Sequence, residues 1–182
     1  MPNTEPKVIN FPPEPTRLPA NVYFDANFLI SWHLPKHRWH LPASQLLKLL
    51  LSRKTRLLVS TLALDEAWWR LLVRFYERDY GRGTWRPDIL RRHPHLPKAY
   101  EPELRGFTAS LLALPRLRVV DQVNSRSLVI RALDHLRDHA LAPRDAFHLA
   151  IAQAIGVPYI VTNDVRFQQI PAPWLTVITF MP

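Results

Sequence analysis

The stretch from Ala142 to Ile170 constrains the fold more than any other part of the chain, because it predicts a helix that leads directly into a buried strand. Pro143 suits the first turn of a helix, where its missing N–H would have no partner, and Gly156 follows the last apolar turn as a stop signal. We therefore expect a helix over 143–155. The apolar run 157–161 is typical of a strand buried on both faces, and a helix feeding such a strand is half of a βαβ unit.

Shorter patterns extend this alternation of strands and helices along the chain. Apolar runs predict further strands over 21–25, 56–60, 117–121 and 174–180, the last at or near a sheet edge. Amphipathic patterns predict helices over 41–51, from Ser60 or Thr61 onward, over 103–114, and over 124–140 with Asn124 as its cap. The order predicts an α/β fold, a three-layer α/β/α sandwich with a mainly parallel central sheet.

Composition limits the class of protein. The 182 residues contain no cysteine, which excludes disulfides and thiolate metal sites and makes a cytoplasmic location the natural expectation. No apolar run is long enough to cross a bilayer, so no membrane association is expected. A formal charge of +9 favours a polyanionic partner, either nucleic acid or an acidic protein segment. We expect a proline-rich arm over 1–20 with no core of its own, then one domain over 21–182.

A basic insertion interrupts the domain at about 77–102. It interleaves the aromatic residues Tyr80, Trp85 and Tyr100 with the cations Arg82, Arg86, Arg91, Arg92 and Lys98. This mixture suits phosphate contacts and base stacking in RNA. A solvated loop whose aromatic residues pin it to the domain is the equal alternative.

Four acids stand out because the predicted topology gathers them at one sheet edge. Asp25 and Asp164 follow strands, Asp145 opens a helix, and Glu66 lies on the helix after the second strand. Each has a simpler explanation alone: Asp25 as a helix N-cap, and Asp65 and Glu66 as first-turn acids favoured by the helix dipole. We prefer Glu66 to its neighbour Asp65, since Glu66 continues an apolar stripe at helical spacing.

Together the four acids predict a metal site. Parallel strands place their carboxyl ends on one edge, and carboxylates crowded there must protonate or recruit a cation. Oxygen-only ligands suit Mg²⁺ or Mn²⁺, which bind phosphate oxygens and activate water. An acid cluster in a basic protein therefore predicts metal-dependent cleavage of phosphodiester bonds.

Three segments in this order resemble the signature stretches of PIN-domain ribonucleases, a family that includes VapC-like toxins: VYFDANFLI, STLALDEAWW and RDAFHLAIAQAIGVPYIVTNDVRF. The resemblance implies an α/β/α sandwich that cuts RNA with Mg²⁺ or Mn²⁺. It further implies that Asp25, Glu66, Asp145 and Asp164 hold the metal, with Asn27, Thr162 and Asn163 as supporting polar residues. A cognate antitoxin and a homodimer are also implied, whereas a standalone RNA-processing nuclease remains an alternative because the chain is longer than compact toxins.

Other residue types receive structural interpretations. Trp68 and Trp69 are expected in the core, and His33, His37 and His40 at the surface, since Pro35 and Pro42 interrupt any shared helix. His135 and His139 are likewise expected at the surface. Two other classes compete: a haloacid-dehalogenase-like phosphatase, disfavoured because Asn27 stands where its second aspartate is needed, and a catalytically inactive binding module, disfavoured because all four acids are present.

Overall fold

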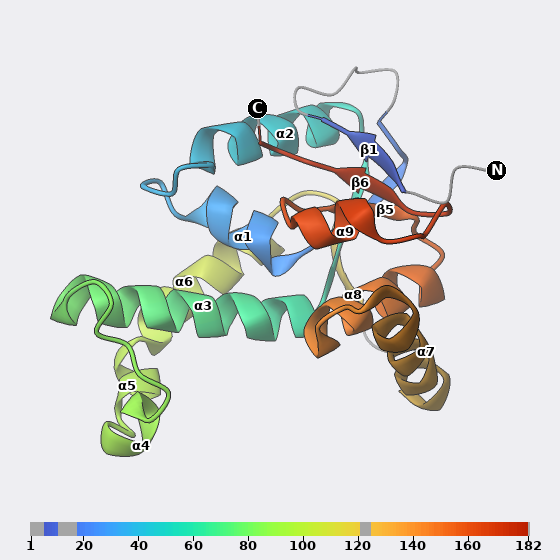
Figure 1. The fold of residues 1–182 in the computed structure, drawn as a ribbon. Helices are drawn as coiled ribbons and strands as arrows, with labels where there is room; N and C mark the ends of the chain where they lie inside the picture. The colour runs from blue at the N-terminus through green and yellow to red at the C-terminus, as the bar shows by residue number, and fades with distance from the viewer. Residues whose placement is uncertain (1–5, 11–17, 121–124, 182) are drawn as a thin grey trace.

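Six parallel strands form one sheet in the computed structural model, which describes residues 6–10, 18–120 and 125–181. Their spatial order is β1-β6-β5-β2-β3-β4 (Figure 1). The strands are β1 (Lys7–Ile9), β2 (Asn21–Phe24), β3 (Arg56–Ser60), β4 (Leu117–Val120), β5 (Tyr159–Val161) and β6 (Thr176–Ile178). The predicted mainly parallel sheet is confirmed.

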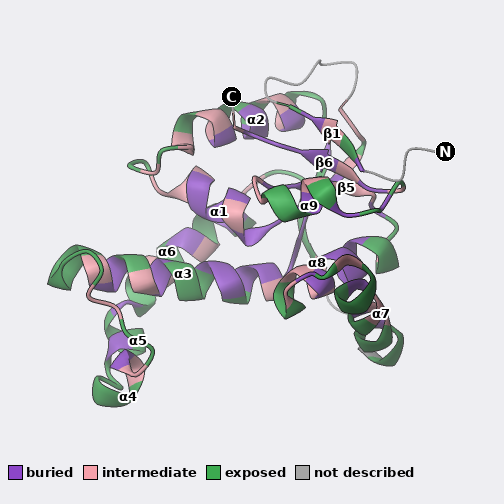
Figure 2. Ribbon diagram, in the orientation of Figure 1, coloured by how far each residue is buried: buried purple, intermediate pink, exposed green. Residues whose placement is uncertain are grey.

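Helices cover both faces of the sheet, which confirms the three-layer sandwich. Side chains of α1 (Ala26–His33), α2 (His40–Ser52), α3 (Thr61–Tyr80) and α6 (Glu101–Leu112) form one hydrophobic core with one sheet face. Those of α7 (Ser125–His139), α8 (Pro143–Ala154) and α9 (Val165–Gln169) form a second core with the other face (Figures 1 and 2).

Strand β2 shows how the sequence sends side chains to the two cores. Successive side chains of a strand point to opposite faces, so Val22 and Phe24 join the first core, whereas Tyr23 joins the second. All three are fully buried, as expected for a central strand between β5 and β3. The carboxyl ends of β5, β2 and β3 thus lie side by side, and this edge carries the predicted acids.

The N-terminal arm differs from its prediction. Residues 7–9 form β1, which pairs with β6 in parallel, and Ile9 is buried in the first core. The sequence predicts an arm with no core of its own and does not predict this strand, because three residues are too few to show a strand pattern. As a result β6 lies second from the edge. The proposed cap at Asn124 falls outside the described residues.

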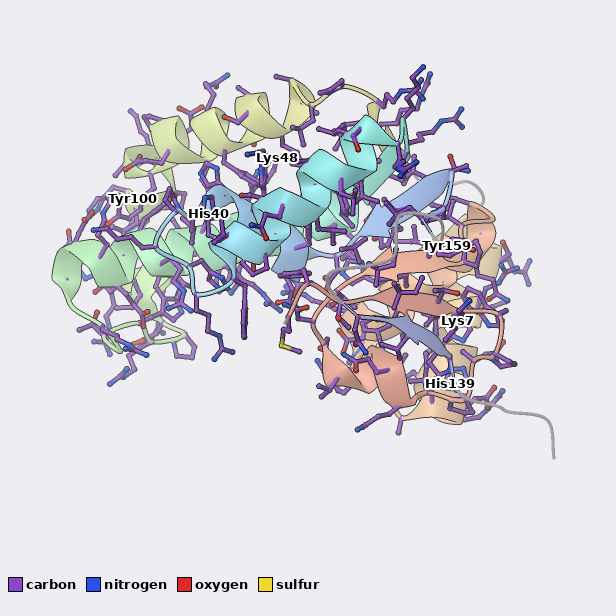
Figure 3. The ribbon with its side chains drawn as sticks, turned by 90° about the horizontal axis from the view of Figure 1, so that it is seen from above. Lys7, His40, Lys48, Tyr100, His139 and Tyr159 are labelled. Carbon is purple, nitrogen blue, oxygen red and sulfur yellow. The ribbon has the colours of Figure 1, made fainter. Side chains whose placement is uncertain are left out.

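The predicted insertion overlaps the ends of two helices, since α3 continues to Tyr80 and α6 begins at Glu101. The residues between them carry two short helices, α4 (Ile89–Arg92) and α5 (Leu96–Ala99), held by buried Ile89, Leu96 and Tyr100. They lie at the end of α3 that is far from α8 (Figure 1). In Figure 3, Tyr100 lies on the opposite side of the molecule from Lys7 and Tyr159 of the sheet.

Two predictions about side-chain burial were wrong. Trp68 and Trp69 are 40% and 39% exposed, because the buried face of α3 follows Ala63, Ala67 and Leu71. His135 is buried rather than at the surface, with its Nε2 3.0 Å from Oε1 of Gln153 on α8. None of the helices in the described ranges combines the length and apolarity needed to cross a membrane.

Candidate active site

The predicted acids lie where three neighbouring strands end. Asp25 follows β2, Thr162 follows β5, and Ser60 ends β3 and caps the helix that carries Glu66. Open α/β sheets bind ligands at this carboxyl edge.

Asp25 is the most firmly held of the four acids. Its Oδ2 accepts hydrogen bonds from Thr162 Oγ1 at 2.7 Å and Asn27 Nδ2 at 3.0 Å, and the residue is 4% exposed. It occupies the N-cap position of α1, yet its side chain makes no capping hydrogen bond. The carboxylate therefore bonds to residues at the sheet edge and does not cap the helix.

Glu66 lies in the second turn of α3 and is also buried. Its Oε1 forms an ion pair with Arg70, and its Oε2 lies 3.3 Å from His148 Nε2. Burial alone would raise the pKa of this carboxyl, but the hydrogen bonds and charges of His148 and Arg70 together lower it to about 2. Asp65 is exposed, which agrees with the choice of Glu66.

His148, which sequence reasoning missed, lies between these two acids. Its Nε2 is 3.7 Å from Asp25 Oδ1 as well as 3.3 Å from Glu66 Oε2, and oxygen or nitrogen atoms of all three residues lie within 4.8 Å of one another. The available signal was its place on α8, three residues after Asp145 and so one turn along the helix that also positions that acid.

A buried hydrogen-bond chain orients the imidazole of His148. Tyr23 Oη lies 2.7 Å from His148 Nδ1 and 2.6 Å from Ser60 Oγ. Burial raises the pKa of the Tyr23 phenol, so the phenol keeps its proton and can donate it to Nδ1. In that tautomer the ring proton sits on Nε2 and faces the two carboxylates.

Asp145 and Asp164 form a second pair, joined by Arg166. Arg166 Nη2 donates to Asp164 Oδ2 at 2.7 Å, and Nη1 lies 2.9 Å from Asp145 Oδ2. Asp164 also caps α9 by accepting from the Arg166 backbone N–H. Although burial opposes it, hydrogen bonding to Arg166 lowers the pKa of Asp164. Burial raises the pKa of Asp145, assisted by the charges of Asp164 and Asp25.

The structure thus brings all four predicted acids to one edge, since Asp25 interacts electrostatically with Asp145 and contacts the same histidine as Glu66. Thr162 and Asn27 support Asp25 directly, whereas Asn163 Oδ1 accepts from the Phe180 backbone N–H and so fixes the C-terminal segment.

The five insertion cations are exposed but lie away from this edge. Arg86 donates to the backbone carbonyls of Gly83 and Trp85, and Arg92 pairs with Asp88. Fourteen residues of α3 separate Glu66 from Tyr80, about 21 Å at 1.5 Å per residue.

The donor set fits a divalent metal. Although Arg166 Nη1 is close to Asp145 Oδ2, its N–H does not point at that oxygen, and the buried oxygen accepts no hydrogen bond. This oxygen is therefore held by the charge of Arg166 and not by a hydrogen bond, and is free to take a metal ion as a further partner. The hard oxygen donors of the four acids suit Mg²⁺ or Mn²⁺.

Comparisons with solved structures agree with this fold. VapC20 of Mycobacterium tuberculosis, a toxin that cleaves the sarcin–ricin loop, matches with a TM-score of 0.52 and 17% identity, over 80% of this chain and 92% of that one. A toxin–antitoxin complex from Klebsiella pneumoniae matches with a TM-score of 0.52 and 20% identity, over 88% and 98%. FitAcB from Neisseria gonorrhoeae matches with 0.50 and 13%, over 87% and 97%. At these identities the likeness concerns the fold alone.

Sequence comparison gives the family. A search against curated proteins gives no match. The family model described as PIN domain matches residues 22–173, which spans the sheet edge with all four acids and His148. This match covers most of the chain, and the chain therefore belongs to the PIN domain family.

Proposed function

We propose that the chain is a metal-dependent endoribonuclease, and that it acts as the toxin of a toxin–antitoxin pair. The observation that carries the proposal is the convergence of Asp25, Glu66, Asp145 and Asp164 at one sheet edge in a chain of net charge +9. Membership of the PIN domain family supports ribonuclease activity. The toxins among the structural neighbours support the toxin role.

The four acids would hold Mg²⁺ or Mn²⁺. When bound, such an ion polarises the phosphate and lowers the pKa of water, which supplies the nucleophile for hydrolysis. Addition of water across the phosphorus–O3′ bond leaves a 5′-phosphate and a 3′-hydroxyl. No separate histidine base is needed, and we assign His148 the role of holding Asp25 and Glu66 in place.

The remaining residues of the site prepare it for an anionic substrate. Thr162 and Asn27 donate to the same oxygen of Asp25, which fixes the orientation of that carboxylate. Arg70 and Arg166 reduce the negative charge of the acids, so a phosphate meets less repulsion on approach. Outer hydrogen bonds of this kind orient metal-binding carboxylates in other proteins.

The partners follow from the same proposal. The substrate is RNA in the cytoplasm, and an antitoxin protein would hold the nuclease inactive. We also propose a homodimer, whose mass in solution tests it. The insertion cations Arg82, Arg86, Arg91, Arg92 and Lys98 remain candidates for RNA contact.

The test compares two adjacent acids on α3. Purified wild-type protein should cleave a mixed RNA pool with Mg²⁺ or Mn²⁺ and stop when EDTA is added. Glu66→Gln should lose roughly 100-fold or more of this activity, whereas Asp65→Asn, an equal charge change at an exposed neighbour, should keep it.

Two results would overturn the proposal. Activity that persists in EDTA would remove the metal, and RNA binding without any cleavage by the wild type would favour the inactive binding module. Equal activity of Glu66→Gln and Asp65→Asn would remove Glu66 from the site.

A further inference from the structure

A cleft of about 480 Å³ opens beside the acids. It lies between the α1–α2 connection, one face of α3, and the C-terminal residues Phe180 and Met181. Two of its lining residues also touch the acids, since Asn27 donates to Asp25 and Arg70 pairs with Glu66. The cleft therefore adjoins the acids, where the proposed function places the scissile phosphate.

Positive charge lines the cleft from two separate elements. Arg38 comes from the α1–α2 connection, while Arg70 and Arg74 come from successive turns of α3. Burial and the charges of Arg74 and Arg38 lower the pKa of His37, which means that both arginines act on one imidazole. Among the described lining residues Glu77 is the only acid, and it lies 3.9 Å from Arg74. Such an excess of cations suits an anionic ligand.

Aromatic rings accompany these cations. Trp69 lines the cleft and stays 39% exposed, although its ring contacts that of Trp85 of the insertion at an interplanar angle of 89°. Trp39 also lines the cleft, with the Arg38 guanidinium 5.0 Å from its ring centroid. Trp69 is exposed and Trp39 is partly buried. Accessible indole surface beside arginines is the combination that binds unpaired bases by stacking and phosphates by charge.

We propose that this cleft binds one unpaired nucleotide of the RNA strand, next to the scissile phosphate. The inference rests on the proposed ribonuclease function and names where the substrate lies. The volume suits a ligand of the size of one nucleotide. RNA is favoured over an acidic protein segment because a phosphate bound at the acids would place the adjoining nucleotide at Asn27 and Arg70, the two residues that connect acids and cleft.

The first experiment measures binding without cleavage. Affinity for a fluorescein-labelled single-stranded RNA of twelve nucleotides is followed against salt concentration in EDTA. The double variant Arg38→Ala/Arg74→Ala should bind about tenfold more weakly, and the slope of log affinity against log salt should flatten by about 1.4, for two lost phosphate contacts. Arg105→Ala/Arg118→Ala removes the same charge from α6 and β4, away from the cleft, and should keep more of both the affinity and the slope.

The second experiment uses two adjacent tryptophans on α3 with equal exposure. Trp69→Leu should weaken binding of the same RNA by roughly fivefold or more through lost stacking. Trp68→Leu is the matched control, because Trp68 faces α6 and donates to Thr108 Oγ1 at 2.9 Å. Melting temperatures of both variants show whether each one is folded.

Several outcomes would overturn the inference. Wild-type affinity and salt slope in Arg38→Ala/Arg74→Ala would do so, as would equal losses in Trp69→Leu and Trp68→Leu. If only the triple variant Arg86→Ala/Arg91→Ala/Arg92→Ala lost affinity for RNA, the insertion and not the cleft would be the RNA-binding surface. If the double variant lost affinity for a glutamate-rich peptide but kept it for RNA, the cleft would belong to a protein partner. Because binding is read in EDTA, failure here is distinct from absence of cleavage, which would instead contradict the proposed function.

Discussion

The two halves of the candidate site are built differently. The inner half comprises Asp25, Glu66 and His148, whose side chains are 5%, 7% and 1% exposed. The outer half comprises Asp145, Asp164 and Arg166, with the acids 13% and 14% exposed and the arginine 50% exposed. Buried hydrogen bonds from β2, β3, α3, α8 and the residue that follows β5 fix the inner half, whereas one arginine side chain joins the acids of the outer half.

On the proposed metal-dependent function, this difference indicates which half would hold its acids in place before a metal ion binds. Hydrogen bonds from Thr162, Asn27 and the Tyr23–His148 chain hold Asp25 and Glu66 in position. These two side chains therefore lose little conformational entropy when a ligand binds. In the outer half Arg166 already pairs with the carboxylates, so a metal must compete with it. Four predictions test the comparison, from the largest expected effect to the smallest.

Thr162→Val should have the largest effect, because Thr162 Oγ1 donates to Asp25 in the inner half and accepts from the Asp164 backbone N–H in the outer half. We expect the cleavage rate to fall about 10–100-fold, the usual range for losing a group that orients a metal ligand. Initial rates on a labelled RNA measure it. Thr179→Val, a buried threonine whose Oγ1 bonds Asn10 instead, is the control. Equal rates in the two variants would contradict the link between the halves.

Tyr23→Phe should damage the inner half alone. It removes the hydroxyl between Ser60 Oγ and His148 Nδ1 and leaves both buried groups without that partner. We expect the free energy of unfolding to fall by about 1–3 kcal/mol, measured by urea denaturation. Tyr100→Phe, which removes a hydroxyl of the insertion that donates to Asp79 of α3, should cost less. A larger loss in Tyr100→Phe would show that the buried chain is not what stabilises the inner half.

Arg166→Ala tests whether Arg166 competes with metal in the outer half. Removing a half-exposed ion pair worth up to about 1 kcal/mol should tighten Mn²⁺ binding by at most about fivefold, measured by calorimetry. Arg144→Ala is the control, since it removes an exposed charge beside Asp145 on the same helix. If both variants bind Mn²⁺ alike, Arg166 does not compete with the metal.

Asp145→Asn and Asp164→Asn should change metal-free stability in opposite directions at neutral pH. Burial is the main cause of the raised pKa of Asp145 in the folded protein. The stability that Asp145 contributes is therefore present at a pH below the ordinary pKa of a carboxyl group and is lost as pH rises through the pKa of the folded state. Asp145→Asn should therefore be slightly stabilising at pH 7 in EDTA.

The sign is reversed for Asp164. Arg166 lowers its pKa against the effect of burial, so the stability it contributes is present above the ordinary range and is lost as pH falls through the folded pKa. Asp164→Asn should be destabilising at pH 7 and flatten the loss of stability in acid. Thermal melts in EDTA between pH 3 and about 7 measure both variants, and shifts of the same sign would contradict the assignment.

Local patterns in the sequence were enough to predict the layers and the acids. Pro143 and Gly156 bound a helix that the structure ends at Ala154, and the apolar runs of β2, β3 and β5 need a sheet covered on both faces. An acid after a buried strand must lie at the sheet edge, since strand polarity is shared in a parallel sheet. The spacing of apolar residues and the direction of each strand depend only on residues that are neighbours along the chain, which is why the sequence determines them.

Tertiary structure alone decided which side chains meet there. His148 lies 82 residues from Glu66 and 125 from Tyr23 along the chain, so no local pattern brings them into contact. The same limit explains β1, whose three residues become a strand by pairing with β6. It also explains the position of Trp69. The buried face of α3 carries small alanines, so Trp69 lies outside the core and lines the cleft. Packing against distant elements sets these contacts, because side-chain burial depends on what covers a face and not on the face itself.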